Sequence, residues 1–244
     1  MKYLLLLLPA LLLSKSLEEK KCDNGNAKIC HSLGDYLMIH NKTKEALSFY
    51  EKGCFLKHEP SCRKVSEIYL NSDIEVNYDK AIDYLSVSCD KNNFESCHDL
   101  AIIFNEGRGT TIDNWRATNL YNVACDNNFS RSCHNLALLK VEELNFIEAE
   151  KLYKKSCHLN NYASCLNLGN MYYYGDLGVV NFDLANNYYS IACENNYADG
   201  CYNLAFSYFD GSGVESDLET GIILLEKACT LGNEKACTTF KESL

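Results

Sequence analysis

The chain has 244 residues, and its 33 acidic residues exceed its 23 basic ones, giving a formal net charge of −10. An acidic chain is a poor partner for nucleic acid, because that interaction depends on Lys and Arg contacts to phosphates. Proline occurs only at Pro9 and Pro60, so the sequence permits long helices almost everywhere.

Residues 1–16 have the pattern of a secretory signal peptide. Lys2 precedes an apolar run over residues 3–13, which is too short for a transmembrane helix of about 20 residues. We expect cleavage after Ser16, and no later segment is long and apolar enough to span a membrane. The sequence therefore predicts an exported chain, periplasmic or secreted, in which residues 17–244 form a single solenoid domain.

Fourteen cysteines form seven pairs with a constant spacing of eight residues: Cys22 and Cys30, Cys54 and Cys62, Cys89 and Cys97, Cys125 and Cys133, Cys157 and Cys165, Cys193 and Cys201, and Cys229 and Cys237. In an exported chain such regular pairs indicate disulfides. Pairing within each C-x7-C unit is the connectivity that treats every repeat alike. Zinc knuckles of the Cys-x2-Cys kind are absent, and a histidine next to a cysteine points about 100° away from it on a helix. We therefore expect no metal and no cofactor.

Successive pairs begin 32 to 36 residues apart, a period typical of two-helix solenoid repeats, so the chain should hold about six to seven of them. Helix B of each repeat has a small residue, bulky residues three and four positions later, and the cysteine at offset eight, which together mark one helical face. Helix A is expected to begin at the second cysteine of a pair. The small residues of helix B are Ala46, Ala81, Ala117, Ala149, Ala185 and Gly221.

The turns within C-x7-C contain a conformational signal. The third residue after the first cysteine is Asn or Gly in six of seven pairs, namely Gly25, Asn92, Asn128, Asn160, Asn196 and Gly232, with Lys57 as the exception. These two residue types tolerate the left-handed conformation that ends a helix. Glycines at 107, 175 and 211 are predicted to end helix A. The repeats beginning at Cys30 and Cys133 are four residues shorter there, which predicts a tighter turn with both helices kept.

Three local patterns match a known family. Leu168-Gly-x-x-Tyr172, Gly211-x-Gly-Val214 and the alanine, aromatic and cysteine pattern over residues 185–193 resemble Sel-type repeats, relatives of tetratricopeptide repeats. With a disulfide per repeat and a signal peptide, the chain resembles the Helicobacter cysteine-rich protein family. This resemblance implies an all-α, right-handed α/α superhelical solenoid, secretion, and penicillin binding with slow β-lactamase activity.

The residues give the β-lactamase alternative little support, and the catalytic residues stay unknown. Ser61-x-x-Lys64 and Ser88-x-x-Lys91 match the first element of serine β-lactamases, but the Ser-Asp-Asn and Lys-Thr-Gly elements are missing. Each serine also adjoins a disulfide cysteine. If the enzyme class applies, β-lactams or peptidoglycan fragments would be the ligands.

The residues favour the other class, a binding scaffold that takes a peptide or protein, from the bacterial envelope or a host surface, on the concave face lined by A helices. Two residues after the helix A cysteine, Asp99, Asn135, Asn167 and Asn203 stand in register. Each could contact a peptide backbone in the groove or cap its own helix. We expect Trp115 to pack within a B helix and the protein to be a monomer.

Overall fold

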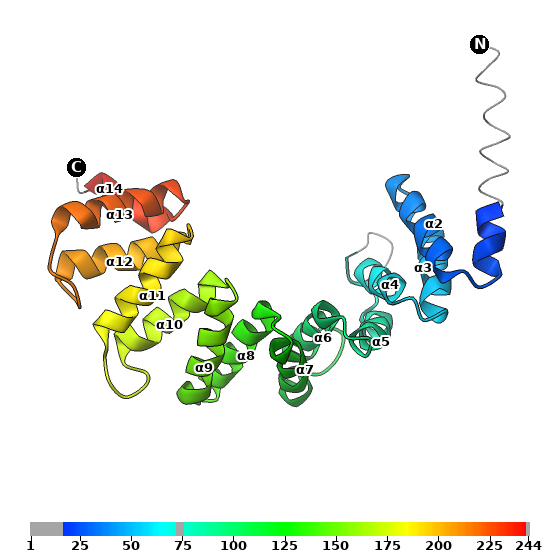
Figure 1. Cartoon of the computed structure of the whole chain (residues 1–244), viewed down its shortest axis with the longest axis horizontal. Coiled ribbons are helices and arrows are strands. Elements are labelled where there is room, and N and C mark those ends of the chain that lie inside the picture. The colour runs from blue at the N-terminus through cyan, green and yellow to red at the C-terminus, as the bar shows by residue number, and fades with distance from the viewer. Residues whose placement is uncertain (1–16, 72–75, 243–244) are drawn as a thin grey trace, which may run out of the picture. The chain divides into compact units, whose positions relative to one another are not determined.

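The computed structural model in Figure 1 describes residues 17–71 and 76–242. The predicted signal peptide over residues 1–16 lies outside these ranges. Within them, all regular secondary structure is helical. The short helical segment over residues 17–23 leads into Cys22 and the first disulfide.

Helices A and B alternate along the chain, as the cysteine spacing predicts. The A helices are α2 (Ala27–Ile39), α4 (Glu59–Asn71), α6 (Phe94–Glu106), α8 (Ser130–Glu142), α10 (Tyr162–Tyr174), α12 (Ala198–Asp210) and α14 (Glu234–Glu242). The B helices are α3 (Thr43–Phe55), α5 (Tyr78–Cys89), α7 (Asn114–Asp126), α9 (Phe146–His158), α11 (Phe182–Glu194) and α13 (Leu218–Thr230). Helix A begins three residues before its cysteine rather than at it, as Tyr162 and Cys165 illustrate.

Contacts divide the chain into two compact units, Met1–Leu120 and Tyr121–Leu244. The first unit contains α2 to α6 and the beginning of α7, and the second contains the end of α7 and α8 to α14. The single domain over residues 17–244 stays a prediction.

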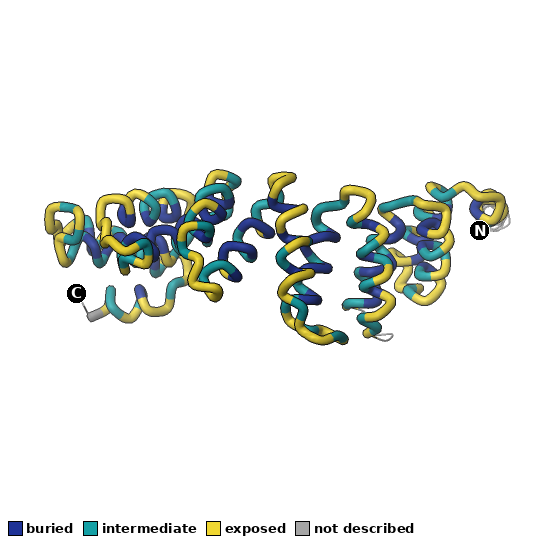
Figure 2. The backbone as a smooth tube through the Cα atoms, turned by 90° about the horizontal axis from the view of Figure 1, so that it is seen from below, coloured by how far each residue is buried: buried dark blue, intermediate teal, exposed yellow. Residues whose placement is uncertain are grey.

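In both units, the buried residues lie on the inner sides of paired helices, and the turns are exposed (Figure 2). The small residues of helix B are all buried. Tyr50, Tyr121, Tyr153 and Tyr189, each four residues before a helix B cysteine, are among the largest fully buried side chains. The predicted large–small contacts are present: a Cβ added to Gly169 would lie 2.6 Å from the ring of Tyr189.

The backbone of the C-x7-C turns agrees with the Asn and Gly pattern. All seven third residues have positive φ, from 62° at Asn196 to 96° at Gly232. Lys57 does as well, with φ 63°. Gly107, Gly175 and Gly211 end their helices in the left-handed conformation, as predicted.

Both short repeats keep their two helices. Residues 40–42 join α2 to α3, and residues 143–145 join α8 to α9. The tight turn is made by a residue in the left-handed conformation, Asn41 with φ 56° and Leu144 with φ 58°. A leucine is an unusual residue for this conformation because its Cβ approaches the following carbonyl oxygen.

Candidate functional site

Each predicted cysteine pair is a disulfide in the structure, and every bond connects two residues eight apart. The seven bonds join Cys22 to Cys30, Cys54 to Cys62, Cys89 to Cys97, Cys125 to Cys133, Cys157 to Cys165, Cys193 to Cys201, and Cys229 to Cys237. The Cα–Cα distances run from 4.4 Å in the bond of Cys201 to 4.9 Å in that of Cys30. The bonds of Cys62, Cys97 and Cys237 lie between these limits, at 4.6, 4.7 and 4.5 Å. The predicted nearest-neighbour connectivity is therefore confirmed.

The residues that precede the cysteines explain how the helices come close enough. In every C-x7-C pair except the first, the residue before each cysteine is Gly, Ala or Ser. The six pairs of preceding residues are Gly53 with Ser61, Ser88 with Ser96, Ala124 with Ser132, Ser156 with Ser164, Ala192 with Gly200, and Ala228 with Ala236. These residues are buried. They let the antiparallel helices approach closely enough for the disulfide. The small residue before each of these cysteines was visible in the sequence, but our prediction did not use it.

Two of the four predicted ligand residues bond to buried tyrosines of the preceding B helix. The Asn135 amide donates to the Tyr121 hydroxyl oxygen at 3.2 Å, and Asn167 donates to that of Tyr153 at 3.3 Å. Burial raises the pKa of Tyr153 to about 12, an effect that the Asn167 hydrogen bond opposes. These amides therefore satisfy polar groups at the interface between repeats.

Asn203 occupies the same register on α12 and also acts on the tyrosine of the preceding B helix, Tyr189. Burial raises the pKa of Tyr189, and the hydrogen bond with Asn203 opposes that rise. Asn203 has Asn170 as a further partner. Its amide donates to Asn170 Oδ1 at 3.0 Å, and the Tyr189 hydroxyl donates to the same oxygen at 2.8 Å. Asp99 is also half-buried in this register on α6. The residue 14 positions before Asp99 is Leu85, so the tyrosine of the other repeats is missing there.

None of the three asparagines caps its helix. The caps lie four residues before the cysteine: the Asn161 side chain caps α10, while Phe129 and Tyr197 stand at this position of α8 and α12 without a side-chain bond. The cap alternative is therefore wrong for Asn135, Asn167 and Asn203. Whether any of them also contacts a ligand stays a prediction.

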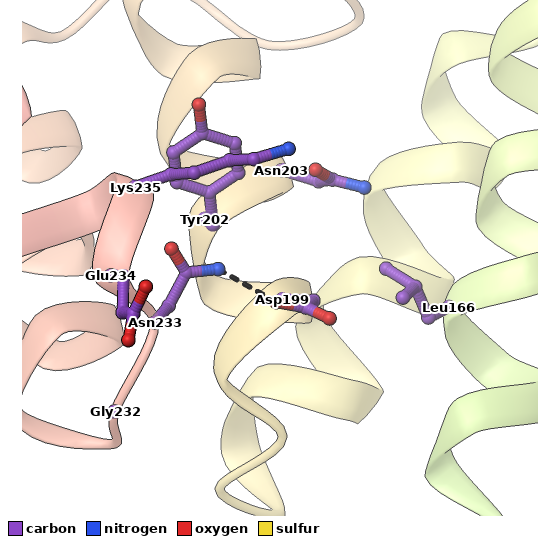
Figure 3. Close-up of a pocket in the computed structure, with 8 residues that line it drawn as sticks. All are labelled: Leu166, Asp199, Tyr202, Asn203, Gly232, Asn233, Glu234 and Lys235. Carbon is purple, nitrogen blue, oxygen red and sulfur yellow. Dashed lines mark hydrogen bonds between the residues drawn. The ribbon is translucent and has the colours of Figure 1, made fainter.

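Two neighbouring pockets of the second unit meet at Asn203. The first, which we call the polar pocket, has a volume of about 510 Å³ and is shown in Figure 3; it is lined by Leu166, Asp199, Tyr202, Asn203, Gly232, Asn233, Glu234 and Lys235. The second, the aromatic pocket, has a volume of about 210 Å³ and is lined by Tyr173, Tyr174, Tyr189, Tyr202, Asn203, Phe206 and Asp210. Tyr202 and Asn203 belong to both.

The polar pocket lies between consecutive A helices. Asp199, Tyr202 and Asn203 come from α12, Leu166 comes from α10, and the opposite wall is the start of α14 with its preceding turn. The Asn233 amide donates to Asp199 Oδ1 at 2.6 Å across the pocket, as the dashed line in Figure 3 indicates, and Asn233 Oδ1 also accepts from the Ala236 amide. The floor is thus fixed by hydrogen bonds, while Lys235 is exposed.

Apart from Lys235 of the polar pocket, the segment that forms most of these two pockets carries only negative charge. Between Lys155 and Lys227 the sequence has no Lys or Arg, and it has nine acidic residues: Asp176, Asp183, Glu194, Asp199, Asp210, Glu215, Asp217, Glu219 and Glu226. This segment includes α10, α11 and α12. The uneven distribution of basic residues, which the net charge of the chain does not reveal, gives these helices a negative potential.

Comparisons with known proteins identify the repeat. The Sel1 repeat model matches five consecutive segments, residues 60–93, 94–129, 130–161, 163–197 and 198–233. The chain belongs to the Sel1 repeat family. The predicted fold class, an all-α solenoid of Sel-type repeats with one disulfide per repeat, is therefore confirmed.

Several solved structures are similar. A protective antigen of uropathogenic Escherichia coli has 21% identity and a TM-score of 0.81, with 92% of this chain covered and 50% of the antigen. This chain thus spans half of the antigen's length. A Sel1 repeat protein from Oxalobacter formigenes has 20% identity and a TM-score of 0.72, with 84% of this chain and 86% of that chain covered. At these identities the likeness shows the fold alone.

Helicobacter pylori cysteine rich protein B is 35% identical, with 51% of this chain and 92% of that chain covered and a TM-score of 0.42. The sequence match and the disulfide in each repeat support the resemblance to the Helicobacter cysteine-rich proteins. Among curated proteins, cytochrome c oxidase assembly factor 7A of Xenopus laevis is 29% identical, over 77% of this chain and 71% of that protein.

The serines of the β-lactamase alternative are inaccessible in this Sel1 repeat protein. Ser61 and Ser88 both have an exposed fraction of 0%. The Ser88 hydroxyl donates to Glu59 at 2.6 Å and accepts from Ser96 at 2.8 Å. Neither oxygen can reach a β-lactam carbonyl without opening the interface between repeats.

Ser61 also contacts two histidines. Its Oγ lies 3.2 Å from His31 Nδ1 and 2.9 Å from His58 Nδ1, and His31 Nε2 lies 3.5 Å from Asp35. This set resembles a catalytic triad, but Ser61 is buried and out of reach of a substrate. Burial and the neighbouring His31 lower the pKa of His58, which keeps its imidazole neutral. His134 and Ser164 repeat the contact at 2.7 Å in the next short repeat. The recurrence identifies it as packing between successive A helices.

The prediction that Trp115 packs within its B helix is wrong. Trp115 is 75% exposed. It lies two positions before the buried Ala117, which turns its side chain about 200° away from the core face of α7. It lines a pocket of about 400 Å³ with Leu100, Phe104 and Leu120 among others.

The part of the chain that the structure describes contains no candidate for a membrane-spanning helix or for a metal site. No helix in residues 17–71 and 76–242 is long and apolar enough to cross a membrane. In the same ranges, no three His, Cys, Asp or Glu side chains come together as metal ligands would.

Proposed function

We propose that this protein is an exported Sel1 repeat scaffold that binds an extended segment of a peptide or protein on the face formed by α10, α12 and α14. The observation that carries the proposal is the meeting of the polar and aromatic pockets at Tyr202 and Asn203. A chain that crosses Asn203 would place side chains in both pockets.

The chemistry of Asn203 suits a polypeptide backbone. An amide side chain offers two N–H donors and an oxygen with two acceptor positions. One donor serves Asn170, and the half-exposed side chain lines both pockets. The amide also interacts with the Tyr189 hydroxyl, which opposes the rise of the Tyr189 pKa caused by burial. The side-chain oxygen of Asn203 matches the N–H groups of an extended chain.

The three asparagines of the register differ in this respect. Asn135 and Asn167 bond to tyrosine hydroxyls and line neither of the two pockets, whereas Asn203 lines both. The proposal therefore assigns ligand contact to Asn203 and a structural role to Asn135 and Asn167. Asp99 lies in the other unit and has no part in this site.

The disulfides support export. Structural disulfides persist in oxidising compartments and are rare in the cytosol. Seven such bonds, one at each turn between repeats, would have no stable role in a reducing compartment. The periplasm and the exterior of the cell both meet this requirement.

A peptide-library selection tests the proposal. The oxidised chain from residue 17 onward is used to select binders from a displayed random 12-residue library, and their affinities are measured for Asn203→Ala and Asn135→Ala. Both substitutions remove one amide hydrogen bond, at 3.0 Å and 3.2 Å respectively, so they should cost similar stability, about 1 kcal/mol.

The site predicts different effects on binding. Asn203→Ala should weaken binding about tenfold or more, which corresponds to 1.4 kcal/mol, whereas Asn135→Ala should leave it unchanged. Selected peptides that bind both variants like the original chain would remove this face from consideration. Failure to select any peptide would contradict the scaffold function itself.

A further inference from the structure

The aromatic pocket has the chemistry of a cation site. We propose that it receives the side chain of an arginine in the bound polypeptide, an inference that rests on the proposed function and specifies its ligand. Five of its seven lining residues are aromatic: Tyr173, Tyr174, Tyr189, Tyr202 and Phe206. The faces of aromatic rings attract cations, and a guanidinium both stacks on them and fits the fork of a carboxylate.

The rings come from three successive helices and are held by their own contacts. Tyr173 and Tyr174 at the end of α10 meet edge to face at 5.2 Å between centroids, and Tyr202 and Phe206 of α12 lie 4.8 Å apart. Tyr189 of α11 is buried, and its hydroxyl is fixed by Asn170. Tyr174, in contrast, is 71% exposed. The pocket therefore has a fixed aromatic floor and an accessible ring at its mouth.

A carboxylate completes the pocket. Asp210 is exposed and lies four residues after Phe206, on the same face of α12. Within the described part of the chain, Asp210 forms no ion pair and no side-chain hydrogen bond, which agrees with the lack of Lys and Arg between residues 155 and 227. A cationic ligand would supply the partner that this segment does not contain.

The helix ends add to the negative potential. Tyr174 is the last residue of α10 and Asp210 is the last residue of α12, so the C-terminal ends of both helices lie at this pocket. The carbonyl end of a helix carries partial negative charge, which favours cations. The carbonyls of Tyr172, Tyr208 and Phe209 already accept hydrogen bonds from Asn181, Asp217 and Ser216, so only the dipoles of the two helices contribute here. Ring faces, a carboxylate and two helix C-termini thus favour the same charge.

The charge and the shape of the ligand are tested with two small probes. N-acetylarginine N-methylamide is titrated into the oxidised full chain, and the ring resonances of the tyrosines are followed by NMR. N-acetylcitrulline N-methylamide has nearly the same shape without the charge. We expect the arginine amide to bind about tenfold more tightly than the citrulline amide. Equal binding of the two probes, or no saturable shift with either, would overturn the inference.

Two pairs of variants locate the site. Asp210→Asn should reduce the preference for arginine several-fold, whereas Asp176→Asn removes the same charge from the same segment, at an exposed residue outside the pocket lining, and should have little effect. Tyr174→Ala should weaken binding, and Tyr36→Ala, at an exposed ring of the other unit, should not. If Asp176→Asn has the same effect as Asp210→Asn, the general field of the segment and not the pocket binds the probe, which contradicts the inference.

The outcomes separate this inference from the proposed function. Library peptides that depend on Asn203 but bind equally well after arginine is replaced by citrulline would overturn the arginine pocket and keep the peptide site. Arginine amide binding that depends on Asp210, with no peptide selected from the library, would leave a cation site and overturn peptide binding.

Discussion

Replacing Lys57 with Asn should stabilise the protein, because Lys57 has a backbone conformation that suits Asn better than Lys. It is the only one of the seven C-x7-C turn residues that is neither Asn nor Gly, yet its φ is 63°. The side chain is exposed, so replacing it removes no buried surface. The left-handed conformation costs a residue with a Cβ roughly 1–2 kcal/mol, and Asn tolerates it better than most residues.

Lys57→Asn should recover about half of this cost, close to 1 kcal/mol. In a chain of this size, that change raises the thermal midpoint by about 2–4 °C. Lys57→Gly should help less, because glycine gains about 0.5–1 kcal/mol of extra entropy in the unfolded chain. Lys57→Ala is the matched control, since it removes the same exposed side chain and keeps the Cβ.

The assay needs a local readout because repeats can open separately. The amides of Lys57 and His58 donate to the carbonyls of Cys54 and Gly53 at 2.8 Å and 3.1 Å. Their hydrogen exchange should slow in Lys57→Asn and stay unchanged in Lys57→Ala. The reverse substitution Asn196→Lys should cost a similar amount. Equal gains from Asn and Ala, or no loss in Asn196→Lys, would refute the conformational argument.

Four further outcomes follow from single residues. Leu144→Asn should raise the thermal midpoint, because Leu144 is 75% exposed with φ 58° and the equivalent residue of the other short repeat is Asn41. Gly200→Ala should lower the free energy of unfolding by about 1–3 kcal/mol, since the new Cβ would lie 2.5 Å from that of Ala192 and 3.0 Å from the backbone nitrogen of Cys193; an unchanged melting curve would contradict the close approach. The buried Tyr153 has a pKa raised to about 12, so the stability it confers is complete below its unfolded pKa of about 10 and lost as pH rises from there through about 12; rapid alkaline melts should show Tyr153→Phe losing less stability across this interval than the unsubstituted chain. Fluorescence from Trp115, the sole tryptophan, should show water-exposed emission and strong iodide quenching, and a blue-shifted, unquenched spectrum would mean that a partner or another copy covers it.

Features set by the local backbone were predictable from the sequence. A turn that needs positive φ selects Asn or Gly whatever surrounds it, so Asn92, Asn160 and Gly232 identified the ends of the B helices. The small residues of helix B were equally readable, because a close helix contact needs them at one fixed position in every repeat. Ala81 and Ala149 are fully buried as a result.

Features set by contacts between repeats were not predicted. The partner of Asn135 is Tyr121, 14 residues away, and that of Asn203 is Asn170, 33 residues away. The contact of Asn135 with Tyr121 did have a signal in the sequence. A tyrosine four residues before the first cysteine of a pair occurs together with an asparagine two residues after the second cysteine. The pockets had no such signal, because their volumes depend on how Tyr202 and its neighbours pack.

The residues that hold the repeats together differ from most of those that line the two pockets. Cysteines, the small residues before them and the buried tyrosines form the interface between repeats, whereas Tyr174, Asp210 and Lys235 are exposed. Disulfides stabilise mainly by restricting the unfolded chain, so their contribution does not depend on the exposed surface. Exposed residues of the pockets can therefore change with little loss of stability. Tyr189 and Asn203 are the exceptions, since one is buried and both bond to Asn170, and they connect the binding face to the core.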